Sequence, residues 1–158
     1  MMADRFIFKK PRDIRAQEGR KNMEKIKAII CEPNKPPRLD YIAQDLETLQ
    51  NIVGGYIDVT HALDSGACIV LNDEGKILNL ALNRPLRDKS GAIYDVIAGT
   101  FIIVGDTGAE EFTSLTDEEA ARYMTEYAEP ITEATADIYK PLAAPRLEFV
   151  PCSRLDYL

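Results

Sequence analysis

The sequence contains few of the side chains that most often carry chemistry. Among its 158 residues there is no tryptophan and a single histidine, His61. The three cysteines, Cys31, Cys68 and Cys152, are far apart among apolar neighbours, and no C-x-x-C pattern occurs. This distribution is typical of reduced thiols rather than of a disulfide framework or a zinc site. We therefore predict neither a metal nor a cofactor.

Long apolar segments and the motifs of common enzyme classes are also missing. No run reaches the roughly 18 apolar residues of a membrane span, and no apolar segment near the N-terminus precedes a cleavage site. P-loop, G-x-G-x-x-G and H-E-x-x-H patterns are absent. These absences predict a cytoplasmic protein that is not an enzyme.

Charge is distributed unevenly along the chain, whose formal net charge is −7. Residues 1–22 carry seven basic and three acidic side chains, a net +4, whereas residues 23–158 carry 12 basic and 23 acidic ones, a net −11. Because an acidic body repels phosphates, nucleic acid binding is expected only through the basic arm of residues 1–22.

The composition and the placement of proline predict three parts. With 46% hydrophobic residues the chain can bury a core. We assign residues 23–130 to a single α+β domain, preceded by residues 1–22 as a flexible basic arm. Residues 131–158 form a C-terminal tail interrupted by proline, which is expected to dock on the domain or on a partner.

Two helices are predicted from their capping residues. Asp45 and Gly54 are suited to the two ends of a helix over residues 46–53. Thr116 and Glu119 have the spacing of a capping box, which predicts an acidic helix over residues 117–128. The residues expected to face inward are Leu46, Leu49 and Val53 in the first helix and Ala120, Tyr123, Met124 and Tyr127 in the second.

Alternating apolar residues predict the strands. A first strand over residues 24–31 precedes a proline-rich loop, and a closing strand covers residues 100–104. Between them, segments at 56–63, 67–71 and 76–82 are separated by turn-forming residues, which predicts an antiparallel meander.

A polar loop is expected over residues 84–91, after the predicted meander. The predicted fold class is α+β, a small curled antiparallel sheet (meander) with one or two packed helices and a C-terminal acidic helix.

Acidic residues are concentrated near the second helix. Eight acids and one base, Arg122, lie between residues 106 and 129. Such a surface can imitate phosphates and bind a basic groove on another protein, whereas acids in the first turn of a helix also favour its dipole. The candidate protein-binding residues are Asp117, Glu118, Glu119, Glu126 and Glu129.

Asp106 and His61 are the two positions at which the sequence offers candidates for catalysis by a single side chain. The D-T-G-A sequence that begins at Asp106 resembles the active-site loop of retroviral-type aspartic proteases, which requires two carboxylates that share a proton. A turn at the end of a strand explains the same residues. His61 is in phase with the apolar residues of its predicted strand, which favours a half-buried structural role. No catalytic residue is predicted.

Four segments in order carry a family resemblance: LQNIVGGYI at 49–57, NDEGK at 72–76, LALN at 80–83 and GTFIIVG at 99–105. With the first strand, they resemble an uncharacterised domain family, DUF3846-like, of phages and conjugative elements of Gram-positive bacteria, over residues 24–108. The resemblance implies a bacterial host cell and names no reaction or catalytic residue.

The leading hypothesis is a non-enzymatic binding protein of a phage or mobile element, which antagonises a host defence or host protein through the acidic surface. One alternative is a sponge for a nucleotide-derived signalling molecule, with its pocket in a homo-oligomer. The candidate ligand-binding residues are Tyr56, Asn72, Asn83, Arg84 and Arg87. A hydrolase that uses Asp106 and a nucleic acid binder that uses the basic arm complete the alternatives.

Overall fold

The fold is given by a computed structural model, which describes residues 25–61, 63, 66–108 and 111–144. The predicted arm, Cys152, the tail beyond residue 144 and most of the predicted turn at residues 64–66 lie outside the described residues. The division of the chain into arm, domain and tail therefore stays a prediction.

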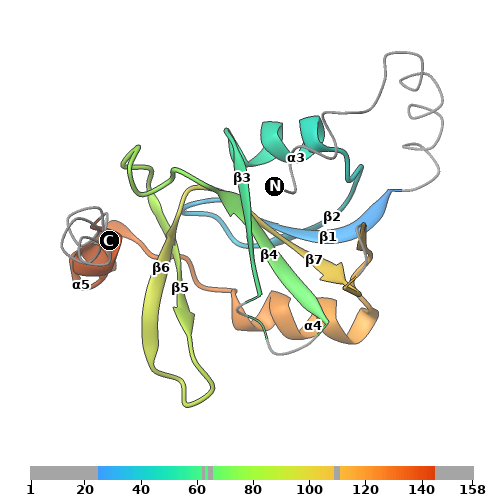
Figure 1. The fold of residues 1–158 in the computed structure, drawn as a ribbon. Coiled ribbons are helices and arrows are strands. Elements are labelled where there is room, and N and C mark those ends of the chain that lie inside the picture. Colours follow the sequence, from blue (N-terminus) through green and yellow to red (C-terminus); the bar gives the residue numbers. More distant parts are fainter. Residues whose placement is uncertain (1–24, 62, 64–65, 109–110, 145–158) are drawn as a thin grey trace, which may run out of the picture.

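The centre of the molecule is an open antiparallel sheet (Figure 1). Its strand order is β2-β1-β7-β4-β3, and β8 pairs with the last two residues of β7. The strands are β1 (Ile26–Cys31), β2 (Arg38–Ile42), β3 (Ile57–Thr60), β4 (Ala67–Asn72), β7 (Phe101–Asp106) and β8 (Phe112–Thr113). The central position of β7 follows from its sequence, because residues 101–104 are apolar on both faces and fully buried.

One helix covers each face of this sheet (Figure 1). Helix α3 (Leu46–Val53) packs against the apolar residues of one face, and α4 (Asp117–Glu126) against those of the other. Both helices begin as predicted: the Asp45 side chain accepts from the Thr48 backbone N–H, and Thr116 and Glu119 form the capping box. Gly54 ends α3 in the left-handed region, at φ 84°. The α+β fold class is confirmed.

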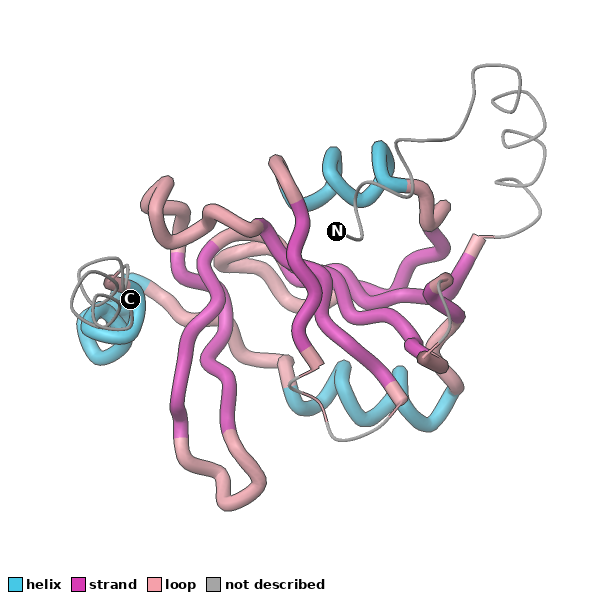
Figure 2. Tube along the Cα trace, viewed as in Figure 1, coloured by secondary structure: helices cyan, strands magenta, loops and turns pink. Residues whose placement is uncertain are grey.

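A second, two-stranded sheet lies beside α4. Strands β5 (Leu82–Arg87) and β6 (Ile93–Ala98) form a hairpin that extends away from the main sheet (Figure 2). An irregularity in register at Asn83 places two successive side chains of β5, Asn83 and Arg84, in the interior. Leu86 and Ile97 join the hairpin to the core on the α4 side.

The hairpin corrects two predictions. Residues 84–91 are not a loop throughout, since residues 84–87 belong to β5. Residues 76–82 are not the third strand of a meander, because residues 73–79 form consecutive turns in which Asn79 has a φ of 59°. The second neighbour of β4 is therefore β7, a strand distant in sequence.

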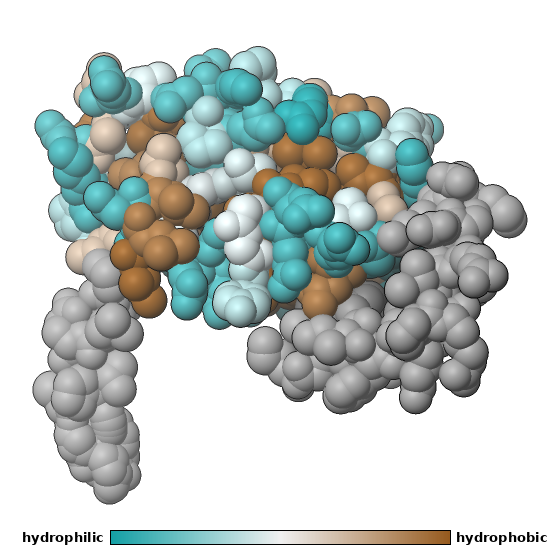
Figure 3. Space-filling model, turned by 90° about the horizontal axis from the view of Figure 1, so that it is seen from above, coloured by the Kyte–Doolittle hydropathy of each residue, from teal (hydrophilic) through white to brown (hydrophobic). Residues whose placement is uncertain are grey.

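Helix α5 (Glu133–Ala143) occupies the start of the predicted tail and lies beside β5 and β6. Pro141 is inside its last turn, and because proline has no backbone N–H it cannot donate the hydrogen bond of that position. Among the described residues, no helix is long and apolar enough to cross a membrane. On the face seen from above, hydrophobic residues are divided into separate patches by hydrophilic ones (Figure 3).

Candidate functional site

The main candidate site is a cavity of about 780 Å³ between the β5–β6 hairpin, α4 and the end of β3. The hairpin contributes Arg87, Lys89 and Tyr94, while α4 contributes Arg122 and Tyr123. Its volume falls in the range of small-molecule sites, about 300–1,000 Å³. We call it the hairpin cavity.

Cationic side chains outnumber acidic ones along the hairpin cavity. The lining includes three basic side chains, those of Arg87, Lys89 and Arg122, and two acidic ones, those of Asp88 and Glu126. This local excess of positive charge contrasts with the net charge of −7 of the whole chain. An anionic ligand is therefore favoured at this place over a cationic one.

Aromatic rings line the same cavity. Tyr94 is 44% exposed, whereas Tyr123 and Tyr127 are buried at its base. The guanidinium of Arg122 lies 5.2 Å from the centre of the Tyr123 ring. Because a cation over a ring face is attracted by the ring electrons, this contact holds the positive charge beside the cavity. The lining thus combines positive charge with aromatic surface.

The tip of the hairpin is fixed by Asp88. Its Oδ1 accepts hydrogen bonds from the backbone N–H groups of Ser90 and Ala92, at 2.9 and 3.0 Å, and from the Ser90 hydroxyl at 2.7 Å. These bonds, led by that of the Ser90 hydroxyl, lower the pKa of Asp88. Nearby, Arg87 donates to the Gly91 carbonyl at 3.0 Å. The Asp88 carboxylate therefore orders the loop.

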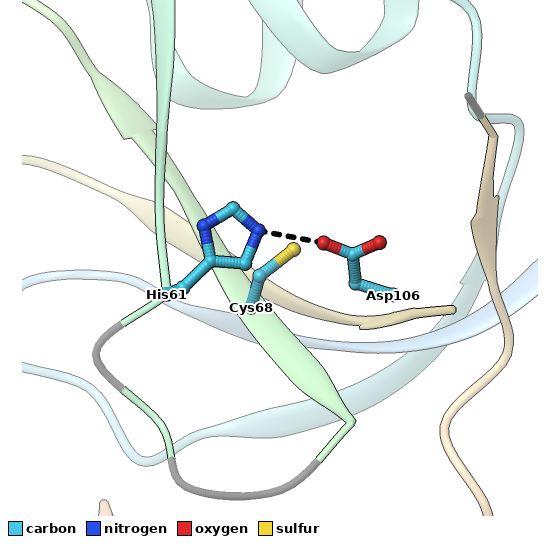
Figure 4. A group of neighbouring side chains, drawn as sticks. All are labelled: His61, Cys68 and Asp106. Carbon is cyan, nitrogen blue, oxygen red and sulfur yellow. Dashed lines mark hydrogen bonds and ion pairs between the residues drawn. The ribbon is translucent and has the colours of Figure 1, made fainter. Parts of the chain in front are cut away.

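A second cluster lies at the end of the sheet, where His61, Cys68 and Asp106 come together (Figure 4). His61 Nε2 is 2.7 Å from Asp106 Oδ2. One potential metal-binding atom from each of the three residues lies within 4.8 Å of the other two. The register of β3 with β4, continued by one residue, places His61 opposite Cys68. The pairing of Cys68 with Val104 brings Asp106 alongside, two residues further along β7.

The three side chains of this cluster differ in exposure and charge. The His61 side chain is 68% exposed and that of Asp106 is 14% exposed, whereas Cys68 is fully buried. A hydrogen bond from the backbone N–H of Gly108 lowers the pKa of Asp106, and His61 adds to this effect. Burial, with the nearby Asp106 carboxylate, raises the pKa of Cys68 to about 12. The thiol is therefore neutral near pH 7 and is not an activated nucleophile.

The aspartic hydrolase alternative at Asp106 stays a prediction. That chemistry requires a second carboxylate close enough to share a proton. Among the described residues, His61 Nε2 lies 2.7 Å from Asp106 Oδ2, and the Cys68 side chain also interacts with the Asp106 carboxylate.

Asn83 and Arg84, two of the predicted ligand-binding residues, are completely buried and form a polar cluster within the protein. Arg84 donates to the carbonyls of Tyr127 and Lys35, at 2.9 and 2.8 Å, and to Asn83 Oδ1 at 2.6 Å. Asn83 in turn donates to the carbonyls of Cys31 and Gly99. These bonds join β5 to β1 and to the end of α4.

The other three predicted ligand-binding residues are separated from one another. Asn72 is buried, where it donates to the Val53 carbonyl and accepts from the Glu74 backbone N–H. Tyr56 is 67% exposed just before β3. Arg87 lines the hairpin cavity. The five residues thus do not form one site.

Some acidic residues of α4 and of the segment after it make local contacts, and others are exposed. Asp117 pairs with Lys27 of β1, Glu119 completes the capping box, and Glu126 lies 3.8 Å from Arg122. Glu118 and Glu129 are exposed.

Sequence reasoning missed the hairpin cavity and the cluster of His61, Cys68 and Asp106. The cavity depends on β5, whose Pro85 and charged residues suggested a loop. The cluster depends on the register of β3 with β4 and of β4 with β7, which local sequence patterns do not determine.

The fold and the cavity define an open α+β domain with helices on both faces and a hairpin beside them. The sequence pattern of DUF3846, described as a domain of unknown function, matches residues 26–128, and the chain belongs to this family. The matched range extends past the predicted limit at residue 108 and includes α4. No curated protein and no solved structure matches the chain.

Proposed function

We propose that this protein is a non-enzymatic binding protein that captures a small, anionic ligand with an aromatic group, such as a nucleotide, in the hairpin cavity. The observation that supports the proposal is the combination of Arg87, Lys89 and Arg122 with Tyr94 and Tyr123 around about 780 Å³.

The two kinds of lining residue match the two parts of such a ligand. The planar guanidinium of arginine forms paired hydrogen bonds to phosphate oxygens, and lysine adds a point charge. A tyrosine ring offers a surface on which a nucleobase stacks, a contact of about 1–3 kcal/mol per base. Tyr94 is the exposed ring at this place, and Arg87 is on the neighbouring strand.

The biological setting that we propose is a phage or conjugative element in the cytoplasm of a Gram-positive host. In this setting the protein sequesters a nucleotide-derived signal of a host defence, as a sponge. The support for this setting is the family resemblance together with the lining of the cavity. A homo-oligomer would bring further side chains to the cavity.

Native mass spectrometry of protein purified gently from a bacterial host tests this proposal. We expect a retained nucleotide-like mass, and saturable binding when the apoprotein is titrated with a panel of linear and cyclic nucleotides. Arg87→Ala should weaken binding by roughly 10- to 100-fold, because a hydrogen bond to a charged group contributes about 1.5–3 kcal/mol.

Arg38→Ala is the matched control, because Arg38 is an exposed arginine on β2 that pairs with Glu32, outside the lining of the hairpin cavity. It should bind the nucleotide as the wild type does. Equal loss in both variants would indicate general electrostatic attraction and would contradict a site in the cavity.

The acidic surface supports a second candidate function, inhibition of a host protein. The observation in its favour is that Glu118 and Glu129 are exposed, as is 96% of the Asp117 side chain. Such a surface steers and binds a basic groove of a partner that normally holds nucleic acid.

Charge reversal distinguishes this second function from ligand capture. Glu118→Lys combined with Glu129→Lys leaves the Asp117 ion pair and the capping box intact, and should abolish binding to a nucleic acid-binding host protein. The matched control is Glu133→Lys, which reverses an exposed acid on α5. Retained affinity in the double variant would rule out the acidic surface.

A further inference from the structure

We propose that His61, Cys68 and Asp106 form a binding site for a zinc-class divalent cation, a site that shares His61 with the lining of the hairpin cavity. Three segments that are separated in sequence bring a nitrogen, a sulfur and an oxygen donor within 4.8 Å of one another (Figure 4). Within the described residues this is the cluster in which three potential ligands meet.

The donor types match the preferences of zinc. Zn²⁺ binds imidazole nitrogen and carboxylate oxygen at about 2.0–2.2 Å and thiolate sulfur at about 2.3 Å, in tetrahedral geometry. In a tetrahedron these bond lengths place the donor atoms roughly 3.3–3.8 Å apart. The 2.7 Å separation of His61 Nε2 from Asp106 Oδ2 must therefore widen by about 1 Å or less.

The structure allows this small adjustment at His61. Its side chain is 68% exposed and follows the last residue of β3, so ring rotation disturbs little of the core. Cys68 and Asp106 are held in the adjacent strands β4 and β7. Figure 4 shows the sulfur directed toward the space between the imidazole and the carboxylate.

Asp106 is already oriented for a ligand role. The Gly108 backbone N–H donates to its Oδ1 at 2.9 Å, and its Oδ2 is directed at His61. A hydrogen bond to the remote oxygen of a ligating carboxylate is a common outer contact at metal sites, and it fixes the orientation of the ligand.

Charge also balances at this site. One thiolate and one carboxylate neutralise a dication, and imidazole binds as the neutral ligand. The Cys68 thiol transfers its proton to water when the sulfur–metal bond forms. Three protein ligands leave a fourth position for water.

Cobalt(II) titration of the full chain, without a histidine tag and after treatment with a chelator, tests the site. Cobalt occupies tetrahedral zinc sites and reports a bound thiolate through charge-transfer absorption in the near ultraviolet. We expect this absorption to saturate at one equivalent, with intense visible bands, and to disappear when zinc is added.

Three variants locate the metal. Cys68→Ala should abolish the charge-transfer absorption, and Asp106→Asn, which keeps the shape of the side chain, should weaken cobalt binding at least about 10-fold. Cys31→Ala removes another fully buried cysteine and should leave the spectrum unchanged. No saturable spectrum in the wild type, or a thiolate spectrum that persists in Cys68→Ala, would overturn the proposal.

Discussion

At the scale of single residues, Arg84 is a buried charged side chain whose hydrogen bonds hold parts of the core together. It has no exposed surface, and its guanidinium donates to the carbonyl of Tyr127, the C-terminal capping residue of α4. The last turn of α4 has no basic residue of its own. Since a helix C-terminus carries partial negative charge, Arg84 supplies from β5 the positive charge that the helix lacks.

Replacing Arg84 should therefore reduce stability. Arg84→Ala leaves Asn83 Oδ1 and the carbonyls of Tyr127 and Lys35 without their donor, and should lower the free energy of unfolding by about 2–4 kcal/mol in urea denaturation. Arg84→Lys should not rescue it, because a lysine has no planar fork.

Arg87→Ala is the control for Arg84, since Arg87 is exposed on the same strand and should lose under about 0.5 kcal/mol. A stable Arg84→Ala protein that no longer bound nucleotide would instead support the ligand-binding role predicted for Arg84 from sequence.

The Cys31 thiol should be inert in the folded protein. Cys31 is fully buried, and this burial raises its pKa to about 12, so the reactive thiolate is nearly absent at pH 8. Iodoacetamide followed by peptide mass spectrometry should show modification of Cys31 only after denaturant is added. Rapid modification of native protein would mean that the β1 region opens readily.

At the scale of elements, Gly105 lets β8 approach β7. A Cβ atom at this position would lie 2.5 Å from Thr113 Oγ1 and 2.7 Å from the Ser114 carbonyl oxygen. Both separations are shorter than real Cβ contacts, so any larger residue displaces β8 and the segment that leads into α4.

Gly105→Ala should accordingly destabilise the fold by about 1–3 kcal/mol, as measured by thermal or urea unfolding. Gly66→Ala is a suitable control, because its Cβ would meet no described atom closer than 3.7 Å. Equal stability of the two variants would contradict a tight β7–β8 contact.

Some helices and strands are specified by neighbouring residues in the sequence, whereas others depend on their place in the sheet. Helices α3 and α4 were predicted from Asp45, Gly54 and Thr116, because caps act within one turn of the chain. Strand β2 was missed since four of its five residues are exposed at the sheet edge, which removes the alternation used to find strands. Strand β5 was missed because Pro85 is tolerated there, in a two-stranded sheet.

At the scale of the whole molecule, stability should be highest between about pH 5 and 8. Hydrogen bonds and ion pairs lower the pKa of five carboxyl groups, those of Glu32, Asp88, Asp106, Asp117 and Asp137. A carboxyl group whose pKa is lower in the folded protein stabilises the fold at any pH above its unfolded pKa, which is about 4. This stabilisation is lost as the pH falls through the pKa of the folded state.

At alkaline pH, stability depends on groups whose pKa is raised, not lowered, in the folded protein. Burial raises the pKa of Cys31 to about 12 and also raises that of Tyr127. Their contribution is complete below the unfolded pKa values, about 8.5 and 10, and declines as the pH rises toward the folded values. The melting temperature measured from pH 3 to 11 should therefore fall at both ends. A melting temperature that rose steadily below pH 4 would contradict the contribution of the carboxyl groups.

The sequence by itself determined the α+β class, the capped helices, the first strand and the apolar strand over residues 100–104, because caps and apolar periodicity act over a few residues. Only the tertiary structure decided which strands are neighbours, that Arg84 is buried and Arg87 is not, and that His61, Cys68 and Asp106 meet. These features depend on register and on packing between segments up to about 75 residues apart, as in the pairing of Ile29 with Ile103, where many pairings have similar local preferences.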